Sequence, residues 1–164
     1  MDSTHELNRD HIHAVKFVGQ GEFGKVYLAT YQTFADGEND QTDAKEVQVA
    51  VKTVNPSVNE RGVREFTEEA ALQLGLQHPN IVQVLGVCMT QKPFMAVLEF
   101  ILYGDLQQVL KTLHDKNITL GESEMMHYAQ QIAGAMAFIS AKQIVHMDLA
   151  GRNCLLHSNN QIKI

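Results

Sequence analysis

The chain has 164 residues, of which 45% are hydrophobic and 20% charged, and this composition is that of a soluble globular protein with a core of its own. The formal net charge of −6 argues against nucleic acid or an anionic membrane surface as the main partner. The most apolar stretch, 94–102, contains Glu99 and is too short to cross a bilayer, and residues 1–10 are too polar for a signal peptide.

Residues 1–12 form a polar lead-in, and a strand then runs into the sequence V-G-Q-G-E-F-G-K-V-Y at 18–27. This sequence fits the pattern G-x-G-x-x-G, which Rossmann folds also use, through Gly19, Gly21 and Gly24. A Rossmann glycine loop opens a helix, whereas residues 25–29 are β-rich and predict a returning strand. Glycines at a hairpin tip let the backbone close over phosphates without side-chain clashes.

A polar connector with five acids follows at 32–46 and predicts a solvated loop. The sequence V-Q-V-A-V-K at 47–52 then predicts a strand, whose alternation places Ala50 and Lys52 on the same face. A small residue and a cation on one face suit contact with an adenine ring and with phosphates. An exposed strand lysine of no special function is the alternative.

Residues 58–76 predict a helix, since apolar residues recur on one side at helical spacing: Val63, Phe66, Ala70 and Leu74. Most glutamates on helices are solvated, but one of Glu65, Glu68 and Glu69 is a candidate partner for Lys52. Two further strands are predicted near 82–87 and 96–101, followed by a short helix that ends near Leu113.

Thr119 and Glu122 fit a capping box for a second long helix. Its apolar stripe predicts core packing and consists of Met125, Ala129, Ile132, Ala133, Met136 and Ile139. Two short strands around an Asn-Asn turn are expected at 154–157 and 161–164. Cys88 and Cys154 lie in apolar contexts, so we expect two reduced and buried thiols.

The sequence I-V-H-M-D-L-A-G-R-N-C-L-L at 144–156 brings four polar residues into one short loop: His146, Asp148, Arg152 and Asn153. A carboxylate and an amide five residues apart suit two tasks at one phosphate. A carboxylate such as that of Asp148 can accept the proton of an attacking hydroxyl, and an amide carbonyl such as that of Asn153 can hold a magnesium ion. Taken by itself, this segment has a polar loop without function as its alternative.

Four separated signals follow the order found in protein kinases: the glycine hairpin, V-A-V-K, E-A…H-P-N-I-V and H-M-D-L-A-G-R-N. The Leu-Ala-Gly-Arg after Asp148 resembles the Leu-Ala-Ala-Arg of tyrosine kinases and differs from the Leu-Lys-x-x of most serine/threonine kinases. The chain therefore resembles a protein tyrosine kinase over essentially its whole length. The resemblance implies an α+β, bilobal protein-kinase-like fold, with a complete small β lobe carrying one helix and the first part of the helical lobe.

The resemblance implies a lead-in at 1–12, the small lobe at 13–99, and the hinge and a partial large lobe at 100–164. It also implies ATP and Mg²⁺ as cofactors. Lys52 then contacts the α- and β-phosphates and pairs with Glu69, which the family spacing selects over Glu68. The other residues implied at the nucleotide are Val18, Gly19, Gly21, Gly24, Val26, Ala50, Leu98, Glu99, Ile101, Asp105 and Leu155.

For catalysis, the resemblance implies that Asp148 is the general base, that Asn153 is a magnesium ligand, and that Arg152 helps to position a protein tyrosine. Two residues depart from the family. Met147 stands where an arginine usually receives a phosphorylated activation loop, and methionine cannot pair with phosphate. Gln73 stands where an apolar side chain usually packs, so it needs a hydrogen-bond partner or solvent.

The aspartate of the D-F-G motif would follow Ile164, so we expect a truncated domain that is inactive by itself and binds ATP weakly. The leading hypothesis is an ATP-dependent protein tyrosine kinase. The alternative is a catalytically weak receptor pseudokinase that acts as a nucleotide-binding signalling scaffold. Met147 and Gln73 favour it, as does a similarity to the receptor pseudokinases related to fly off-track. We expect a cytoplasmic location, either alone or as the cytoplasmic part of a membrane receptor.

Overall fold

The computed structural model describes residues 5–33 and 45–164. The chain divides into two compact units. The first comprises the residues up to Gly75 together with Gln83–Phe100, and the second comprises Leu76–Val82 and Ile101–Ile164. Among the described residues, no helix combines the length and the apolar character that crossing a membrane requires.

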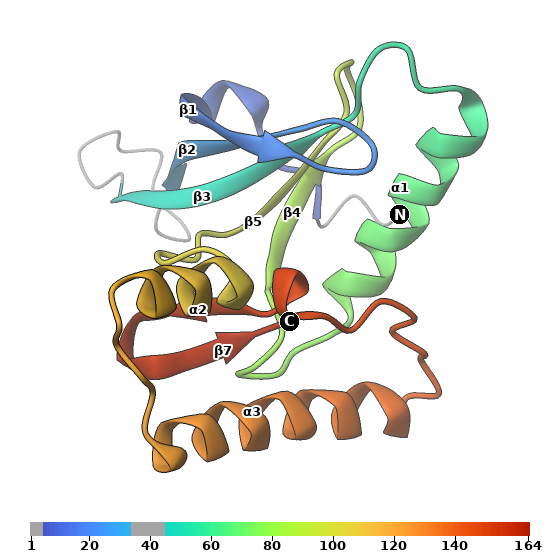
Figure 1. Ribbon diagram of the computed structural model, residues 1–164. Helices are drawn as coiled ribbons and strands as arrows, with labels where there is room; N and C mark the ends of the chain where they lie inside the picture. Colours follow the sequence, from blue (N-terminus) through green and yellow to red (C-terminus); the bar gives the residue numbers. More distant parts are fainter. Residues whose placement is uncertain (1–4, 34–44) are drawn as a thin grey trace. The chain divides into compact units, whose positions relative to one another are not determined.

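The first unit is a five-stranded antiparallel sheet with one helix, as the sequence predicts (Figure 1). Its strands lie in the order β1-β2-β3-β5-β4. Their bounds are β1 Ile12–Gln20, β2 Lys25–Thr33, β3 Lys45–Thr53, β4 Val84–Cys88 and β5 Met95–Glu99. The predicted α+β class is therefore confirmed.

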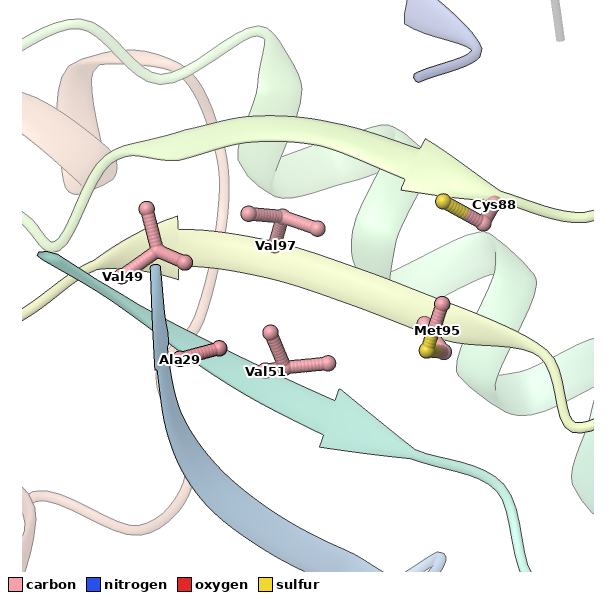
Figure 2. Packing of buried hydrophobic residues seen from close by; sticks show 6 residues of the cluster. All are labelled: Ala29, Val49, Val51, Cys88, Met95 and Val97. Atoms are coloured by element: carbon pink, nitrogen blue, oxygen red, sulfur yellow. The ribbon is translucent and has the colours of Figure 1, made fainter. Parts of the chain in front are cut away.

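The alternation predicted for β3 is present in the structure. Val49 and Val51 are buried, with 0% and 3% exposure, whereas Ala50 and Lys52 on the other face are half-buried. The buried face belongs to a core cluster that Figure 2 shows, formed by Ala29, Val49, Val51, Cys88, Met95 and Val97. One face of the sheet thus supplies the core, and Lys52 lies on the other.

The polar connector predicted at 32–46 is shorter than expected at both ends. Gln32 pairs with Glu46 and Thr33 with Lys45, so these four residues extend β2 and β3 instead of forming loop. Backbone pairing continues through polar residues here because it does not require an apolar side chain. The remainder of the connector, 34–44, lies outside the described residues.

Helix α1, Glu60–Leu74, begins two residues later than predicted. Asn59 takes the N-cap position, and its side chain accepts a hydrogen bond of 2.9 Å from the backbone N–H of Gly62. This cap fixes the start, since it satisfies one of the free N–H groups of the first turn. Phe66 and Ala70 are the buried residues of the helix, which packs against β4.

The second unit contains the helices α2 and α3 and a two-stranded ribbon. The Asn-Asn turn predicted between the strands is confirmed, since Asn159 and Asn160 have φ values of 59° and 56°, a conformation that asparagine tolerates well. The bounds are α2 Leu106–Asp115, α3 Glu122–Ala141, β6 Leu155–His157 and β7 Gln161–Lys163.

The capping box predicted at Thr119 and Glu122 is wrong. Helix α3 begins at Glu122 with Gly121 as its N-cap, and Glu124 accepts a 3.0 Å hydrogen bond from the Gly121 N–H. Glycine has no side chain that could complete the reciprocal bond, so only half of the motif is present.

The apolar stripe predicted for α3 is also partly wrong. Met125 is 50% exposed, and Ala129 and Ala133 are exposed as well. The buried face runs through Tyr128 and Ala135 together with the predicted Ile139, and the predicted Ile132 and Met136 flank it as half-buried residues. The face is rotated because the ring of Tyr128 enters the core while its hydroxyl reaches Asn160 at 3.3 Å.

A polar network holds the parts of the second unit together. The side-chain oxygen of Gln131 on α3 accepts hydrogen bonds of 2.8 Å from the backbone N–H of Ile162 and from the side chain of Asn80. Asn80 also donates to the carbonyl of Ile162 at 2.8 Å. Strand β7 is therefore fixed both to α3 and to the segment Leu76–Val82.

Candidate active site

The glycine hairpin is closed by the backbone itself. Strands β1 and β2 pair as far as Gln20 and Lys25, and Gly21 N–H donates to Gly24 C=O at 2.7 Å across the tip. A Cβ atom at Gly24 would lie 2.1 Å from the backbone oxygen of Thr53. Real Cβ atoms do not approach that closely, so the packing of the tip on the end of β3 requires glycine at this position.

Packing does not require the other two glycines of the pattern. A Cβ atom at Gly19 would meet nothing within 4 Å, and at Gly21 the nearest atom would lie at an ordinary 3.5 Å. Neither has the positive φ that favours glycine, which among the described glycines occurs at Gly104. The missing side chains of Gly19 and Gly21 thus leave open space along the backbone of the hairpin.

Lys52 and Glu69 form the ion pair that the sequence predicts. The Lys52 Nζ on β3 lies 3.4 Å from Oε1 of Glu69 on α1, and their side chains are 39% and 38% exposed. Glu68 is exposed, so the choice of Glu69 over Glu68 is confirmed. The pair holds the ammonium group at the end of β3 with solvent still in reach.

A contact that sequence reasoning missed connects the hairpin to the same helix. Phe23 at the tip packs edge-on against Phe66 of α1, with ring centroids 5.7 Å apart. The signal was present in the sequence, since an aromatic side chain between two loop glycines has no strand face to occupy. The hairpin tip, β3 and α1 are therefore coupled within the first unit.

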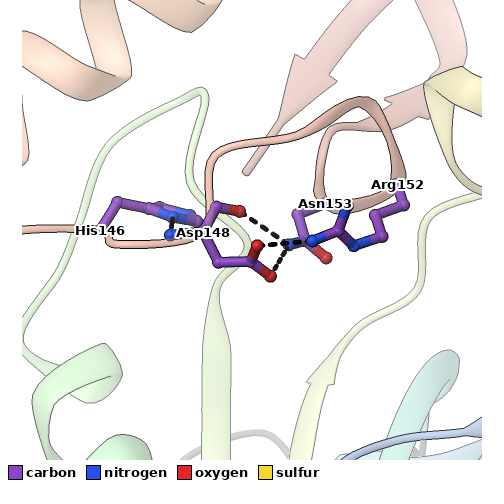
Figure 3. Close-up of polar contacts among 4 residues, drawn as sticks. All are labelled: His146, Asp148, Arg152 and Asn153. Atoms are coloured by element: carbon purple, nitrogen blue, oxygen red, sulfur yellow. Dashed lines mark hydrogen bonds and ion pairs between the residues drawn. The ribbon is translucent and has the colours of Figure 1, made fainter.

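The second cluster surrounds Asp148 (Figure 3). Arg152 Nη2 lies 2.5 Å from Asp148 Oδ1, and Asn153 Nδ2 donates to Oδ2 at 2.7 Å and to the backbone oxygen of Asp148 at 2.8 Å. The 3₁₀ turn Gly151–Asn153 brings both partners back to the aspartate. The Asp148 N–H is 3.3 Å from His146 Nδ1, so the predicted cluster forms as one hydrogen-bonded unit.

The geometry of this cluster has chemical consequences. Because Asn153 uses its nitrogen on Asp148, its amide oxygen points away from the carboxylate (Figure 3). The Asp148 side chain is 62% exposed, so its carboxylate is accessible to a reacting group. A carboxylate oxygen has two lone pairs, and the contacts of Arg152 and Asn153 still leave acceptor capacity for a proton.

The donor set fits magnesium in type and number. Mg²⁺ prefers oxygen ligands and is commonly held by one or two protein groups together with phosphates and water. The amide oxygen of Asn153 supplies one such ligand, whereas the Asp148 carboxylate is engaged by Arg152 and Asn153. Across residues 5–33 and 45–164, no group of three or more His, Cys, Asp or Glu residues forms a closed metal cage.

Five of the other predicted nucleotide residues lie on the sheet of the first unit: Val18, Val26, Ala50, Leu98 and Glu99. Ala50 pairs with Leu98 of β5, and Lys52 pairs with Val26 of β2, so these side chains are neighbours on one face. Leu98 is 4% exposed, and Val26 and Ala50 are half-buried. Val18 on β1 is 57% exposed.

Two of the predicted residues, Glu99 and Asp105, form hydrogen bonds that stabilise the fold itself. The Glu99 carboxylate accepts a hydrogen bond of 2.8 Å from the backbone N–H of Gln83. In the second unit, Asp105 forms an isolated antiparallel bridge with Leu155 and caps α2 through a 2.8 Å bond from the Gln108 N–H. Ile101 is 7% exposed.

The two departures from the family pattern have different environments. Met147 is 90% exposed and adopts a left-handed backbone conformation with φ of 64°. Gln73 is half-buried on α1.

The two thiols are buried, as predicted, with 2% exposure at Cys88 and 3% at Cys154, and burial raises the pKa of both.

A hairpin with a glycine tip, a strand lysine paired with a helix glutamate, and an aspartate held by Arg and Asn in one loop are the parts of a protein kinase. The chain belongs to the protein tyrosine and serine/threonine kinase family, whose model matches residues 12–164.

The relatives include a protein named as a tyrosine-protein kinase and two named as receptors. The chain is 34% identical over 159 residues to the tyrosine-protein kinase ABL2 of Homo sapiens, covering 97% of this chain and 12% of that protein. It is 35% identical over 165 residues to the insulin receptor of Xenopus laevis, covering 97% and 12%. It is 34% identical over 167 residues to the BDNF/NT-3 growth factors receptor of Gallus gallus, covering 96% and 20%. The chain thus spans a fifth or less of the length of these relatives.

Proposed function

We propose that this chain is part of a protein tyrosine kinase that transfers the γ-phosphoryl group of ATP to a protein tyrosine. The observation that carries the proposal is the cluster at Asp148, where an exposed carboxylate is oriented by Arg152 and Asn153 at 2.5 and 2.7 Å. Membership of the kinase family supports it. Catalysis of this kind depends on positioning and charge neutralisation more than on covalent chemistry.

The first unit supplies the groups that bind the phosphates. Lys52 donates to the α- and β-phosphates, and Glu69 at 3.4 Å keeps its ammonium group from turning into solvent. The bare backbone at Gly19 and Gly21 admits phosphate oxygens where a side chain would interfere. Val26, Ala50 and Leu98 supply an apolar surface for the adenine ring.

The second unit supplies the groups that act on the substrate. Asp148 accepts the proton of the tyrosine hydroxyl on its carboxylate, and Arg152 fixes the orientation of that carboxylate and of the substrate. Asn153 offers its amide oxygen to Mg²⁺, which when bound with ATP neutralises charge on the phosphates. We assign the small lobe to 13–99 and the hinge and large-lobe residues to 100–164.

Two observations support tyrosine over serine or threonine as the acceptor. The residues after Asp148 are Leu-Ala-Gly-Arg, and Arg152 is paired with the base in the structure. The relatives reported above are named as a tyrosine-protein kinase, an insulin receptor and a growth factors receptor. Since ATP is the phosphoryl donor, we place the domain in the cytoplasm, alone or as part of a membrane receptor.

A signalling scaffold with weak or no catalysis is the second candidate, and Met147 favours it. Its side chain is 90% exposed at the position next to the base, where it offers no charge to a phosphorylated loop. On this alternative, the chain binds nucleotide through Lys52 but transfers no phosphate.

Phosphotransfer to a tyrosine-containing copolymer, measured with the natural protein that contains this chain, separates the two candidates. The kinase proposal expects phosphotyrosine to form and Asp148→Asn to lower the rate by about 10²- to 10⁴-fold, because the base is lost. Asp115→Asn, a matched change on the exposed end of α2, should leave the rate unchanged. Absence of phosphotyrosine from an unmodified protein that binds ATP would leave the scaffold as the function.

A further inference from the structure

The segment before β1 lies along the free edge of the sheet in the first unit. Strand β4 is the last strand in the sheet order, so one of its edges has no strand partner. Glu6 forms an isolated parallel bridge with Val87 of β4, and the Leu7 N–H donates to the Val87 carbonyl at 2.8 Å. The segment therefore satisfies backbone groups that an edge strand leaves open.

Glu6 binds the turn that follows β4. One of its carboxylate oxygens, Oε1, accepts hydrogen bonds from the backbone N–H groups of Met89 at 2.9 Å and Thr90 at 3.1 Å, and Oε2 lies 3.2 Å from the Met89 nitrogen. Hydrogen bonds to a charged acceptor are stronger than neutral ones, and two adjacent donors require a defined position of the carboxylate. This contact depends on the side chain of Glu6, so it is specific to the sequence.

Arg9 binds the far end of the same turn. Its guanidinium group donates to the backbone carbonyl of Lys92 at 3.1 Å and to that of Pro93. The two charged side chains thus bind opposite kinds of backbone group: Glu6 accepts from N–H donors, and Arg9 donates to C=O acceptors. They hold the segment at two points separated along the turn.

Leu7 provides the apolar contact between these two anchors. Its side chain packs against the core cluster that contains Cys88 and Val97. A Cβ atom at Gly86 would lie 2.5 Å from Leu7 Cγ and 2.7 Å from the backbone oxygen of His5, so only glycine leaves room for the segment. The Cys88 thiol donates to the Leu7 carbonyl at 3.4 Å, and the segment covers this thiol.

The segment does not fill all of the groove that runs along β4 and the turn 89–93. A cavity of about 390 Å³ remains between the two, lined by residues 6–10 on one side and by Cys88, Thr90 and Gln91 on the other. A segment held by one backbone hydrogen bond to β4, a thiol contact, two polar anchors and one apolar side chain, with a cavity beside them, can separate without unfolding of the sheet.

We propose that residues 6–9 form a releasable strap, that the groove along β4 and the turn 89–93 is its docking site, and that release of the strap is a conformational switch that exposes Cys88. Glu6 and Arg9 are the polar anchors and Leu7 is the apolar anchor. The occupant of the groove is this segment of the chain itself, and the proposal does not depend on kinase activity.

The two cysteines allow a test with an internal reference, because both thiols are buried and each lies in a different unit. The whole chain is treated with iodoacetamide, and the modification rates of Cys88 and Cys154 are measured separately by mass spectrometry. The variant Glu6→Met/Arg9→Met replaces both polar anchors by side chains that cannot form these hydrogen bonds, and it leaves the core residues unchanged. Asp10→Asn is the control, since it removes a charge from the adjacent position and keeps both anchors.

We expect the modification rate of Cys88 to rise about tenfold or more in the anchor variant, with Cys154 and the control unchanged. A synthetic peptide of residues 3–12, added at about millimolar concentration, should restore slow modification of Cys88, whereas a peptide carrying the two substitutions should not. An unchanged rate at Cys88, a parallel rise at both thiols, or failure of the unmodified peptide to protect would each overturn the proposal.

Discussion

The glycine hairpin offers a pair of substitutions that separate folding from ligand binding. Gly24→Ala places a Cβ atom 2.1 Å from the Thr53 oxygen and 2.8 Å from the Asn55 nitrogen. Both atoms belong to the backbone, so no side-chain rotation relieves the clash and the tip has to move. Overpacking of this kind costs about 1–3 kcal/mol, and contact with backbone on two sides places this case at the upper end, about 3 kcal/mol.

The same substitution at Gly19 meets no atom within 4 Å, so Gly19→Ala should change the free energy of unfolding by less than about 1 kcal/mol. In a domain of this size, each kcal/mol shifts Tm by about 2–4 °C, which gives a fall of about 6–12 °C for Gly24→Ala. Thermal unfolding followed by circular dichroism measures this. Nucleotide binding to Gly19→Ala, measured by calorimetry, should weaken while its Tm stays near that of the unmodified chain.

A Gly24→Ala protein with an unchanged Tm would refute the packing argument. Equal loss of stability from both substitutions would show that Gly19 also serves the fold and is not kept free for a ligand. Either result would contradict the inference that the fold requires glycine at position 24 but not at position 19.

Two further predictions concern stability. Gln131→Ala should lower the free energy of unfolding by about 2–3 kcal/mol in urea titrations, because the Ile162 N–H loses its acceptor. The control is Gln130→Ala at the exposed neighbouring position, and a change above about 0.5 kcal/mol in that variant would contradict the prediction. Burial raises the pKa of Cys88 and Cys154, so the folded state favours the protonated thiols. The stability that this preference contributes to the folded state is fully present at neutral pH. It is lost as the pH rises through the raised pKa values, and the urea midpoint should fall less between about pH 8 and pH 10 when both cysteines are replaced by alanine.

The sheet and the paired residues were predictable because their signals are local or follow a fixed spacing. Strand alternation alone separates Val49 and Val51 from Lys52, and the structure keeps this separation. The choice of Glu69 over Glu68 rests on the family spacing from the H-P-N-I-V turn. The cluster of Asp148 and Asn153 lies within six consecutive residues, so one short turn is enough to form it.

The helix starts, the buried face of α3 and the long-range contacts were not predictable in this way. They depend on competition between neighbouring residues for one position, or on partners far apart in the sequence. The helix starts were misplaced because Asn59 and Gly121 take the N-cap positions in preference to residues with similar propensity. The prediction placed Ile139 on the buried face of α3 but omitted Tyr128, whose ring is apolar and whose tip is polar. Contacts such as that of Glu6 with Met89 join residues 83 positions apart through a backbone N–H, and side-chain patterns carry no information about such a partner.

Labelling with an acyl-phosphate derivative of ATP tests most directly the claim that Lys52 binds nucleotide phosphates, on which both the kinase and the scaffold depend. The reagent acylates amines close to the phosphates, and Lys45 on the same strand is the internal comparison. We predict that Lys52 is acylated in preference to Lys45 and that, of these two lysines, an excess of ATP suppresses the labelling of Lys52 alone. Equal labelling of the two lysines, unaffected by ATP, would contradict it.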